Sequence, residues 1–172
     1  MTIAVLGLGN VLEGDDAFGP WVIQWLTAHY EFGEGVSVED LGTPGLDLHP
    51  FLVDREVIIV VDTVRSGGAP GELRLYRKDQ ILKHAPQPRL SPHDPGLKES
   101  LMALEFRGDP PREVLLVGAI PGTVDHLIGM TPQLRAAVPL AGAEVVRELA
   151  RLGHPPTRRD PPGEPDIWWE RR

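Results

Sequence analysis

The feature that most constrains the fold is a run of five aliphatic residues, Val57 to Val61 (VIIVV). A strand with one face in water would alternate apolar and polar residues, whereas this run is apolar throughout. A run without alternation is typical of a central strand in a parallel sheet, where helices cover both faces. The sequence therefore predicts a sheet that is buried on both sides.

Other segments of the chain predict the rest of this sheet and its helices. Strand-like runs cover residues 2–8, 36–41, 72–76 and 114–120, and the run at 72–76 has the alternation of an edge strand. Helical spacing of apolar residues covers residues 20–30, 46–53, 97–106 and 131–152. Because strands alternate with helices, we expect a three-layer α/β fold with a mostly parallel sheet and helices on both faces.

Length and composition predict one domain followed by a tail. A chain of 172 residues is long enough to bury most of its apolar surface in one core. From His154 onward the composition changes to five prolines, interleaved charges and two tryptophans. We therefore expect a single α/β domain over residues 1–153 and a proline-rich, flexible tail over residues 154–172.

Charge and hydropathy limit the kind of partner. The chain has 25 acidic and 17 basic side chains, a net charge of -8, whereas a nucleic-acid partner would require a basic face. No apolar run approaches the ~20 residues of a membrane helix, and the N-terminus lacks the pattern of a signal peptide. We expect no nucleic acid, no membrane insertion and a cytoplasmic location. Cysteine is absent, which excludes disulfides, thiolate metal sites and a cysteine nucleophile.

The glycine-rich segment GLGNVLEGDD (residues 7–16) directly follows the first predicted strand. Such segments often bind nucleotide phosphates at the start of a helix. The dinucleotide fingerprint, however, requires a third glycine where this chain has Leu12, and a P-loop requires a lysine that this loop lacks. Asp15 and Asp16 would also repel a pyrophosphate. Nucleotide binding therefore stays only as an alternative, with Asp40 at the end of the second strand as its ribose-binding acid.

Three polar residues converge on one edge of the predicted sheet. Asp16 follows the first strand, Asp62 ends the third, and His93 lies in a proline-bounded loop that could fold over the same edge. Open α/β sheets bind their ligands at this edge, beyond the carboxyl ends of the strands. Two carboxylates and an imidazole suit a borderline divalent ion with open coordination positions. The structural alternative is that Asp15 and Asp16 cap a helix and that His93 is merely solvated.

Five sequence blocks carry a resemblance to a known family. They are GLGNVLEGDDAFGP (7–20), GTPGLDL (42–48), VVDTV (60–64), SPHDPGL (91–97) and HLIGMTP (126–132). In their order and spacing the chain resembles the nickel-iron hydrogenase maturation endopeptidases, over about residues 1–150. These enzymes trim the C-terminus of the hydrogenase large subunit. The resemblance implies a twisted, mostly parallel sheet between helices.

The resemblance also implies an activity and assigns residues to it. The expected activity is removal of the C-terminal extension of the nickel-iron hydrogenase large-subunit precursor after nickel insertion. The family's two metal-binding acids fall on Asp16 and Asp62 and its histidine on His93, which makes these residues the expected catalytic and metal-binding set. Nickel is expected to arrive with the precursor rather than to be held by the free enzyme. The alternative is a non-catalytic α/β module that binds a nucleotide or a metal.

Substrate-binding residues are expected in the two glycine-containing loops beside this edge, because glycine allows another backbone to approach closely. The expected residues are Gly9, Asn10, Asp40, Gly42 and Thr43. For residues 42–45 an ordinary turn is the alternative. Two roles for the metal also stay open. It either polarises the scissile carbonyl or activates water, or it only anchors the substrate while Asp16 or Asp62 acts as general base.

Overall fold

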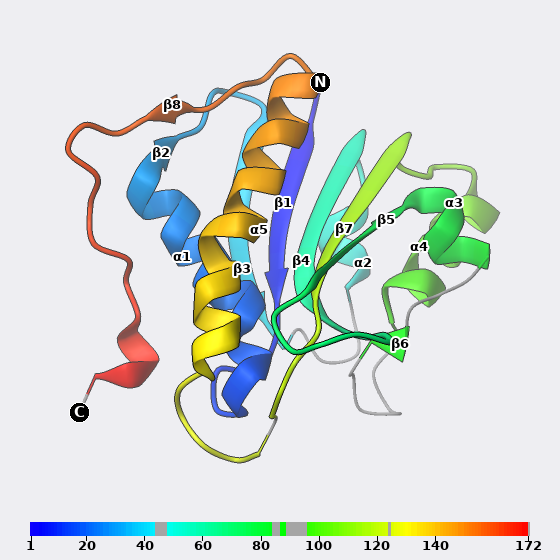
Figure 1. Ribbon diagram of the computed structural model, residues 1–172. Coiled ribbons are helices and arrows are strands. Elements are labelled where there is room, and N and C mark those ends of the chain that lie inside the picture. Colours follow the sequence, from blue (N-terminus) through cyan, green and yellow to red (C-terminus); the bar gives the residue numbers. More distant parts are fainter. Residues whose placement is uncertain (44–47, 84–86, 89–95, 124, 172) are drawn as a thin grey trace.

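The computed structural model describes residues 1–43, 48–83, 87–88, 96–123 and 125–171. Its centre is a sheet with the strand order β3-β1-β4-β7-β5 (Figure 1). These strands are β1 (Ile3–Leu8), β3 (Val36–Gly42), β4 (Val57–Arg65), β5 (Leu73–Arg77) and β7 (Glu113–Ala119). Neighbouring strands are parallel except at β5, which runs antiparallel to β7. The short β6 (Gln87–Pro88) pairs with the end of β4.

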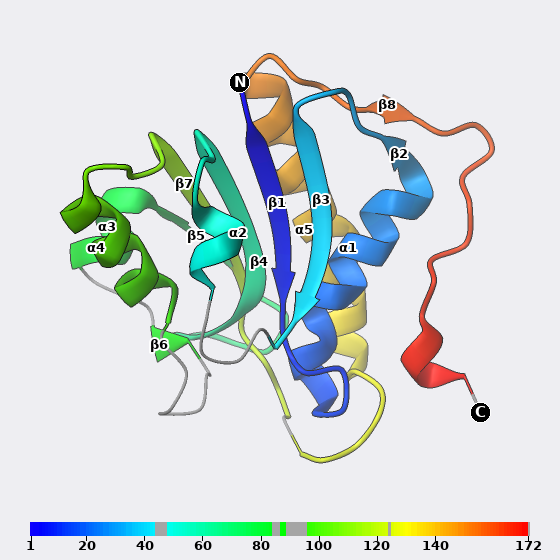
Figure 2. The same cartoon turned by 180° about the vertical axis from the view of Figure 1, so that it is seen from behind.

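Helices cover both faces of the sheet (Figures 1 and 2). One face carries α1 (Phe18–His29) and α5 (Pro132–Arg151), and the other carries α2 (His49–Leu52), α3 (Lys78–Lys83) and α4 (Leu97–Arg107). The predicted three-layer α/β fold with a mostly parallel sheet is confirmed. Within the part of the chain that the structure describes, no helix has the length and apolar character needed to cross a membrane.

The central strand contributes to both cores, as its unbroken apolar run predicts. Val57, Ile59 and Val61 pack in the core under α1 and α5, whereas Ile58 and Val60 pack in the core on the opposite face. All five side chains are at most 1% exposed. Each apolar residue of this strand is therefore removed from water, which is the dominant favourable term in folding.

Some element boundaries differ from those predicted. The third strand continues past Val61 to Arg65, so Asp62 lies within β4 rather than at its end. The predicted helix over residues 46–53 is a single turn at His49–Leu52. Helix α3 was not predicted, because its six residues are too few to show an apolar period.

Residues 154–171 of the proline-rich C-terminal tail lie along α1 (Figure 1). Its strand β8 (Thr157–Arg158) pairs with β2 (Tyr30–Glu31), directly after α1. Farther on, the Gly163 N–H donates to the Ala28 carbonyl over 2.8 Å. The tail then runs down to the edge of the sheet where β1 ends (Figure 1). Composition alone could not show this, since these contacts depend on partners more than 100 residues away.

A buried carboxylate near the other end of the sheet joins α5 to two strands. Glu148 is 4% exposed and accepts hydrogen bonds from Arg77 of β5 at 2.6 Å and from Arg151 at 2.7 Å. Arg151 also pairs with Glu113 of β7. Burial by itself would raise the pKa of the Glu148 carboxyl, but the hydrogen bonds from Arg151 and Arg77 outweigh it and lower the pKa to about 2.

This lowered pKa predicts a loss of stability in acid. A carboxyl whose pKa is lower in the folded than in the unfolded chain stabilises the fold above its ordinary pKa of 4.5. That contribution disappears as the pH falls from 4.5 toward 2. The parent should therefore melt well above Glu148→Gln at pH 6, and the two thermal midpoints should converge below pH 4. The control Glu144→Gln, in an ion pair of the same helix, should change the midpoint little. A difference in thermal midpoint between parent and Glu148→Gln that stays constant with pH would contradict the lowered pKa of Glu148.

Candidate functional site at the carboxyl edge of the sheet

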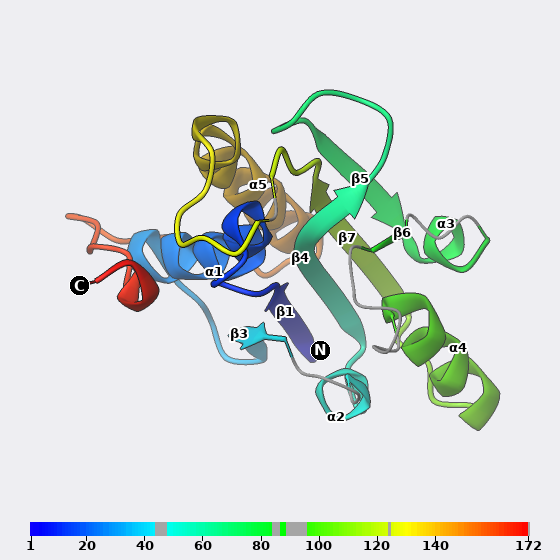
Figure 3. The ribbon, with the colours of Figure 1, turned by 90° about the horizontal axis from the view of Figure 1, so that it is seen from below.

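The glycine-rich loop lets α1 begin directly against the end of β1. Gly9 has a φ of +146°, and a Cβ at this position would lie 1.9 Å from the Asp16 carbonyl oxygen. A Cβ at Gly19 would lie 2.2 Å from the Leu8 carbonyl oxygen. Only glycine permits these approaches. The loop therefore folds into the 3-10 turn η1 (Gly14–Ala17), which brings two acids to the carboxyl edge of the sheet (Figure 3).

Asp16 is buried at this edge, with 8% of its surface exposed. Its Oδ2 accepts a hydrogen bond from the Asn10 backbone N–H at 2.8 Å. Its Oδ1 accepts one from the Thr63 hydroxyl at 3.0 Å. The carboxylate is thus oriented by its own loop on one side and by β4 on the other.

Asp62 follows the aliphatic run within β4 and is 6% exposed. Its Oδ1 accepts a hydrogen bond from the Thr63 N–H at 2.7 Å. The two acids thus share a neighbour, because Thr63 donates its hydroxyl to Asp16 and its N–H to Asp62. Two of the three residues expected to form the site therefore accept hydrogen bonds from the same residue of β4.

The third expected residue, His93, lies outside the described residues. Across the described ranges, no cluster of three or more side chains of the metal-binding types comes together. The described part of the site is therefore the pair of carboxylates around Thr63. Both supply oxygen atoms, which are suitable ligands for a divalent ion in combination with imidazole.

Thr63 is a site residue that the sequence analysis did not identify. It is fully buried, with 0% of its surface exposed, and its hydroxyl bonds to a residue 47 positions earlier. Its place next to Asp62 in the block VVDTV was the available signal. Adjacency alone does not show that the hydroxyl reaches a second acid, because that contact requires the pairing of β1 with β4.

Asp15 points away from this pair and has a different role. It is fully buried, and its carboxylate accepts hydrogen bonds from the backbone N–H groups of Gly122, Thr123 and Thr131 at 2.7, 3.1 and 2.7 Å. The Thr131 hydroxyl adds a fourth at 2.9 Å. Neither η1 nor α1 has a side-chain cap, so the expected capping of its own helix is wrong. Asp15 instead holds the segment that leads into α5.

A groove of about 400 Å³ lies at the loop after β1, where Asn10, whose N–H bonds to Asp16, is part of its lining. Its lining comprises Gly9, Asn10, Val11, Asp40, Leu41, Gly42, Thr43 and Trp168. All five residues expected to bind substrate are among them. The Gly9 N–H donates to the Gly42 carbonyl at 2.8 Å, which joins the two loops. Burial raises the pKa of the Asp40 carboxyl, although hydrogen bonds from Gly42 and Gln24 oppose this shift.

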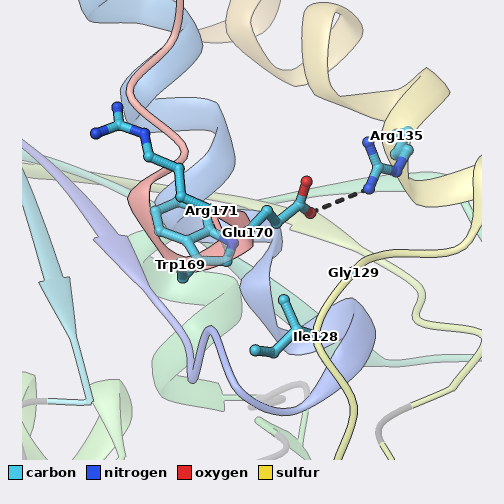
Figure 4. Close-up of a pocket in the computed structure, with 6 residues that line it drawn as sticks. All are labelled: Ile128, Gly129, Arg135, Trp169, Glu170 and Arg171. Carbon is cyan, nitrogen blue, oxygen red and sulfur yellow. Dashed lines mark hydrogen bonds and ion pairs between the residues drawn. The ribbon is translucent and has the colours of Figure 1, made fainter.

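A second cavity, of about 460 Å³, lies between the end of the tail and the segment before α5 (Figure 4). Its lining residues are Ile128, Gly129, Arg135, Trp169, Glu170 and Arg171. An ion pair between Arg135 and Glu170, 3.0 Å long, spans it. None of the expected site residues lines this cavity, so its larger volume does not make it the functional site.

The fold defines an α/β protein with two buried acids, Asp16 and Asp62, as the described part of its candidate site, and comparison with known proteins identifies the family. Residues 20–148 match the family model of the hydrogenase maturation proteases. The chain belongs to this family and is a peptidase. The predicted family and the predicted enzyme class are confirmed, in preference to a non-catalytic module.

Individual relatives agree with this assignment. The chain is 34% identical over 154 residues to the Hydrogenase 2 maturation protease of Escherichia coli (strain K12), covering 89% of this chain and 93% of that protein. It is 35% identical over 159 residues to the hydrogenase expression/formation protein HupM of Azotobacter chroococcum mcd 1, covering 92% of this chain and 76% of that protein.

Solved structures show the same fold. The hydrogenase maturating endopeptidase HybD from Escherichia coli superimposes with a TM-score of 0.84 at 32% identity, over 94% of this chain and 99% of that one. The hydrogenase 2 maturation peptidase from Thaumarchaeota archaeon SCGC_AB-539-E09 gives a TM-score of 0.67 at 31% identity, over 87% and 99%. The architecture of this chain is therefore that of solved maturation peptidases.

The burial of Asp15 predicts a large loss of stability on its removal. Asp15→Ala leaves three backbone N–H groups without their acceptor, and each buried unsatisfied donor costs about 1 kcal/mol or more. The free energy of unfolding, measured by chemical denaturation, should fall by roughly 3 kcal/mol. The exposed control Asp109→Ala should change it by less than about 0.5 kcal/mol. A loss of only about 1 kcal/mol in Asp15→Ala, as a simple helix cap would give, would contradict this role.

The two hydrogen bonds of Thr63 predict an effect on the rate of peptide-bond cleavage. Thr63→Val keeps the shape of the side chain and the N–H bonded to Asp62, but removes the donor to Asp16. Loss of a partner that orients a site residue typically lowers activity about 10- to 100-fold, and we expect a fall in this range. Thr63→Ser retains the hydroxyl and should keep most of the activity. Equal rates for the valine variant and the parent would show that the hydroxyl does not orient Asp16.

Proposed function

We propose that this protein removes the C-terminal extension of a nickel-iron hydrogenase large-subunit precursor after nickel insertion. The observation that carries the proposal is the pair of buried carboxylates, Asp16 and Asp62, joined through Thr63 in a member of the maturation protease family. The name of the relative from Escherichia coli, Hydrogenase 2 maturation protease, supports a hydrogenase as the substrate. The cytoplasmic location expected from the sequence is part of the proposal.

In this proposal nickel belongs to the substrate. Asp16 and Asp62, together with His93, engage the ion that the precursor carries. Oxygen and imidazole nitrogen donors suit nickel, and three ligands leave positions for groups of the precursor. Recognition of the ion would restrict cleavage to precursor that has received its nickel, so an unfilled precursor would keep its extension.

The two carboxylates have a chemical role in either version of the mechanism. A divalent ion at the site polarises a carbonyl or lowers the pKa of a water molecule. Where the ion serves only in recognition, an oriented carboxylate takes the proton from the attacking water as general base. The hydrogen bonds from Asn10 and Thr63 hold Asp16 in one orientation, which serves both roles.

We further propose that the groove at the loop after β1 binds the precursor next to the scissile bond. Asn10 supports this assignment, since its N–H bonds to Asp16 while the residue also lines the groove. Gly9, Asp40, Gly42 and Thr43 complete the proposed substrate-binding set. Glycine at two of these positions leaves backbone groups accessible to an extended peptide.

The test uses nickel-loaded precursor and follows the mass of its C-terminus over time. Asp16→Ala, Asp62→Ala and His93→Ala should each slow release of the extension by at least about 100-fold, because each removes one of three groups that act together. A double variant should be little worse than a single one. Asp16→Glu, which retains a carboxylate, should keep partial activity.

The control for these variants is Asp109→Ala, an exposed acid outside the site, which should process the precursor at the parental rate. Circular dichroism should show that all variants are folded. Folded Asp16→Ala or His93→Ala that releases the extension as fast as the parent would show that the proposed site is wrong.

A further inference from the structure

The end of the tail carries two adjacent tryptophans with opposite environments. In the 3-10 turn η2 (Trp168–Glu170), Trp169 is 4% exposed and Trp168 is 55% exposed. Their rings meet edge to face, with centroids 5.5 Å apart. One indole is therefore part of the packed protein, whereas the other presents a large apolar surface to its surroundings.

Trp169 and Glu170 together anchor this end of the tail to α1 and α5. The Trp169 ring packs edge to face on Trp21 of α1, with centroids 6.4 Å apart. The neighbouring Glu170 accepts a hydrogen bond from Arg135 of α5 at 3.0 Å (Figure 4). The Arg135 guanidinium also lies over the Trp21 ring, 5.4 Å from its centroid. The position of Trp168 is thus set by several contacts made by the residues that follow it.

Trp168 lines the same groove as Asn10, whose N–H donates to Asp16. The other lining residues come from the loop after β1 and from the end of β3, more than 120 positions away in the chain. Two of them, Gly9 and Gly42, have positive φ angles and no side chain. The groove therefore combines glycine backbone with an exposed indole supplied by the tail.

We propose that Trp168 is a substrate-contacting residue that packs against the peptide segment of the precursor next to the scissile bond. The inference rests on the proposed function and adds the tail to its site. Asn10 connects the groove to Asp16, since it lines the groove and its N–H donates to that carboxylate. Its volume of about 400 Å³ is typical of a ligand-binding site. Tryptophan is among the residues that contribute most to binding at such surfaces.

An extended peptide is the occupant that this groove suits. Glycine backbone on one side lets the main chain of the peptide approach, and an indole on the other covers it with apolar surface while losing little side-chain entropy. Because the contact is with bound substrate and not with the reacting atoms, it should affect binding far more than the chemical step.

The experiment measures kcat and KM for nickel-loaded precursor. Trp168→Ala should raise KM about tenfold with kcat within about twofold of the parent. Trp168→Phe should restore most of the affinity, because an aromatic ring can still cover the peptide. The matched control is Phe106→Ala on α4, an aromatic residue that is 94% exposed and does not line the groove, and it should behave as the parent.

Thermal unfolding separates this role from a structural one. Trp168→Ala loses only its edge-to-face contact with Trp169 and should melt within about 4 °C of the parent, whereas Trp169→Ala should lower the midpoint by about 10 °C and raise KM as well, because it releases the anchor. A midpoint for Trp168→Ala as low as that of Trp169→Ala would assign Trp168 a structural role and overturn the inference.

Two further outcomes distinguish the inference from the proposed function. If the parent cleaves the precursor and Trp168→Ala has the parental KM, the inference is wrong and the proposed function stands. If the parent does not cleave nickel-loaded precursor, the proposed function fails and the inference fails with it. A change of oligomeric state in Trp168→Ala, measured by sedimentation, would make the indole a contact between copies of the chain and would also overturn the inference.

Discussion

The close approach of α1 to the end of β1 and to the middle of β4 is the constraint on which the candidate site depends. A Cβ at Gly19 would lie 2.2 Å from the Leu8 carbonyl oxygen and 2.6 Å from that of Val61, so the helix can start here only with glycine. The short 3-10 turn before the helix carries Asp15 against the segment that leads into α5 and Asp16 against Thr63 of β4. The glycines of this loop thus serve backbone packing, and through it they place carboxylates where a nucleotide-binding loop would place phosphates.

Asp15 and Asp16 are adjacent, but Asp15 has a structural role and Asp16 belongs to the candidate site. Asp15 is enclosed by donors from the segment before α5, and Asp16 is held by its own loop and by Thr63. Burying a carboxylate destabilises the fold unless the group is hydrogen-bonded, and these bonds offset the loss of hydration for both acids. Asp15 therefore ties the loop to the segment before α5, whereas the orientation of Asp16 comes from Asn10 and Thr63.

The sequence predicted the features that follow from local pattern. The run Val57–Val61 identified the central strand, and the spacing of Asp16 and Asp62 after strand-like runs identified two acids at one edge. Features that depend on distant partners could not be predicted in this way. The Thr63 hydroxyl reaches back 47 positions, and the acceptors of the tail lie more than 100 positions before it. Prolines oppose regular structure, but a segment without regular structure can still dock through side chains and single backbone bonds.

The candidate site residues Asp62 and Thr63 lie in the packed sheet, whereas Trp168, which lines the groove, lies in the C-terminal tail. Asp62 and Thr63 lie within a central strand, where any shift would disturb packing on both faces of the sheet. Trp168 lies near the end of a tail that is fixed by an indole, an ion pair and a few backbone bonds. Substitutions in the tail therefore leave the carboxylates in place. In the proposed function, this separation lets the affinity for a particular precursor be tuned at Trp168 without altering the groups that engage nickel.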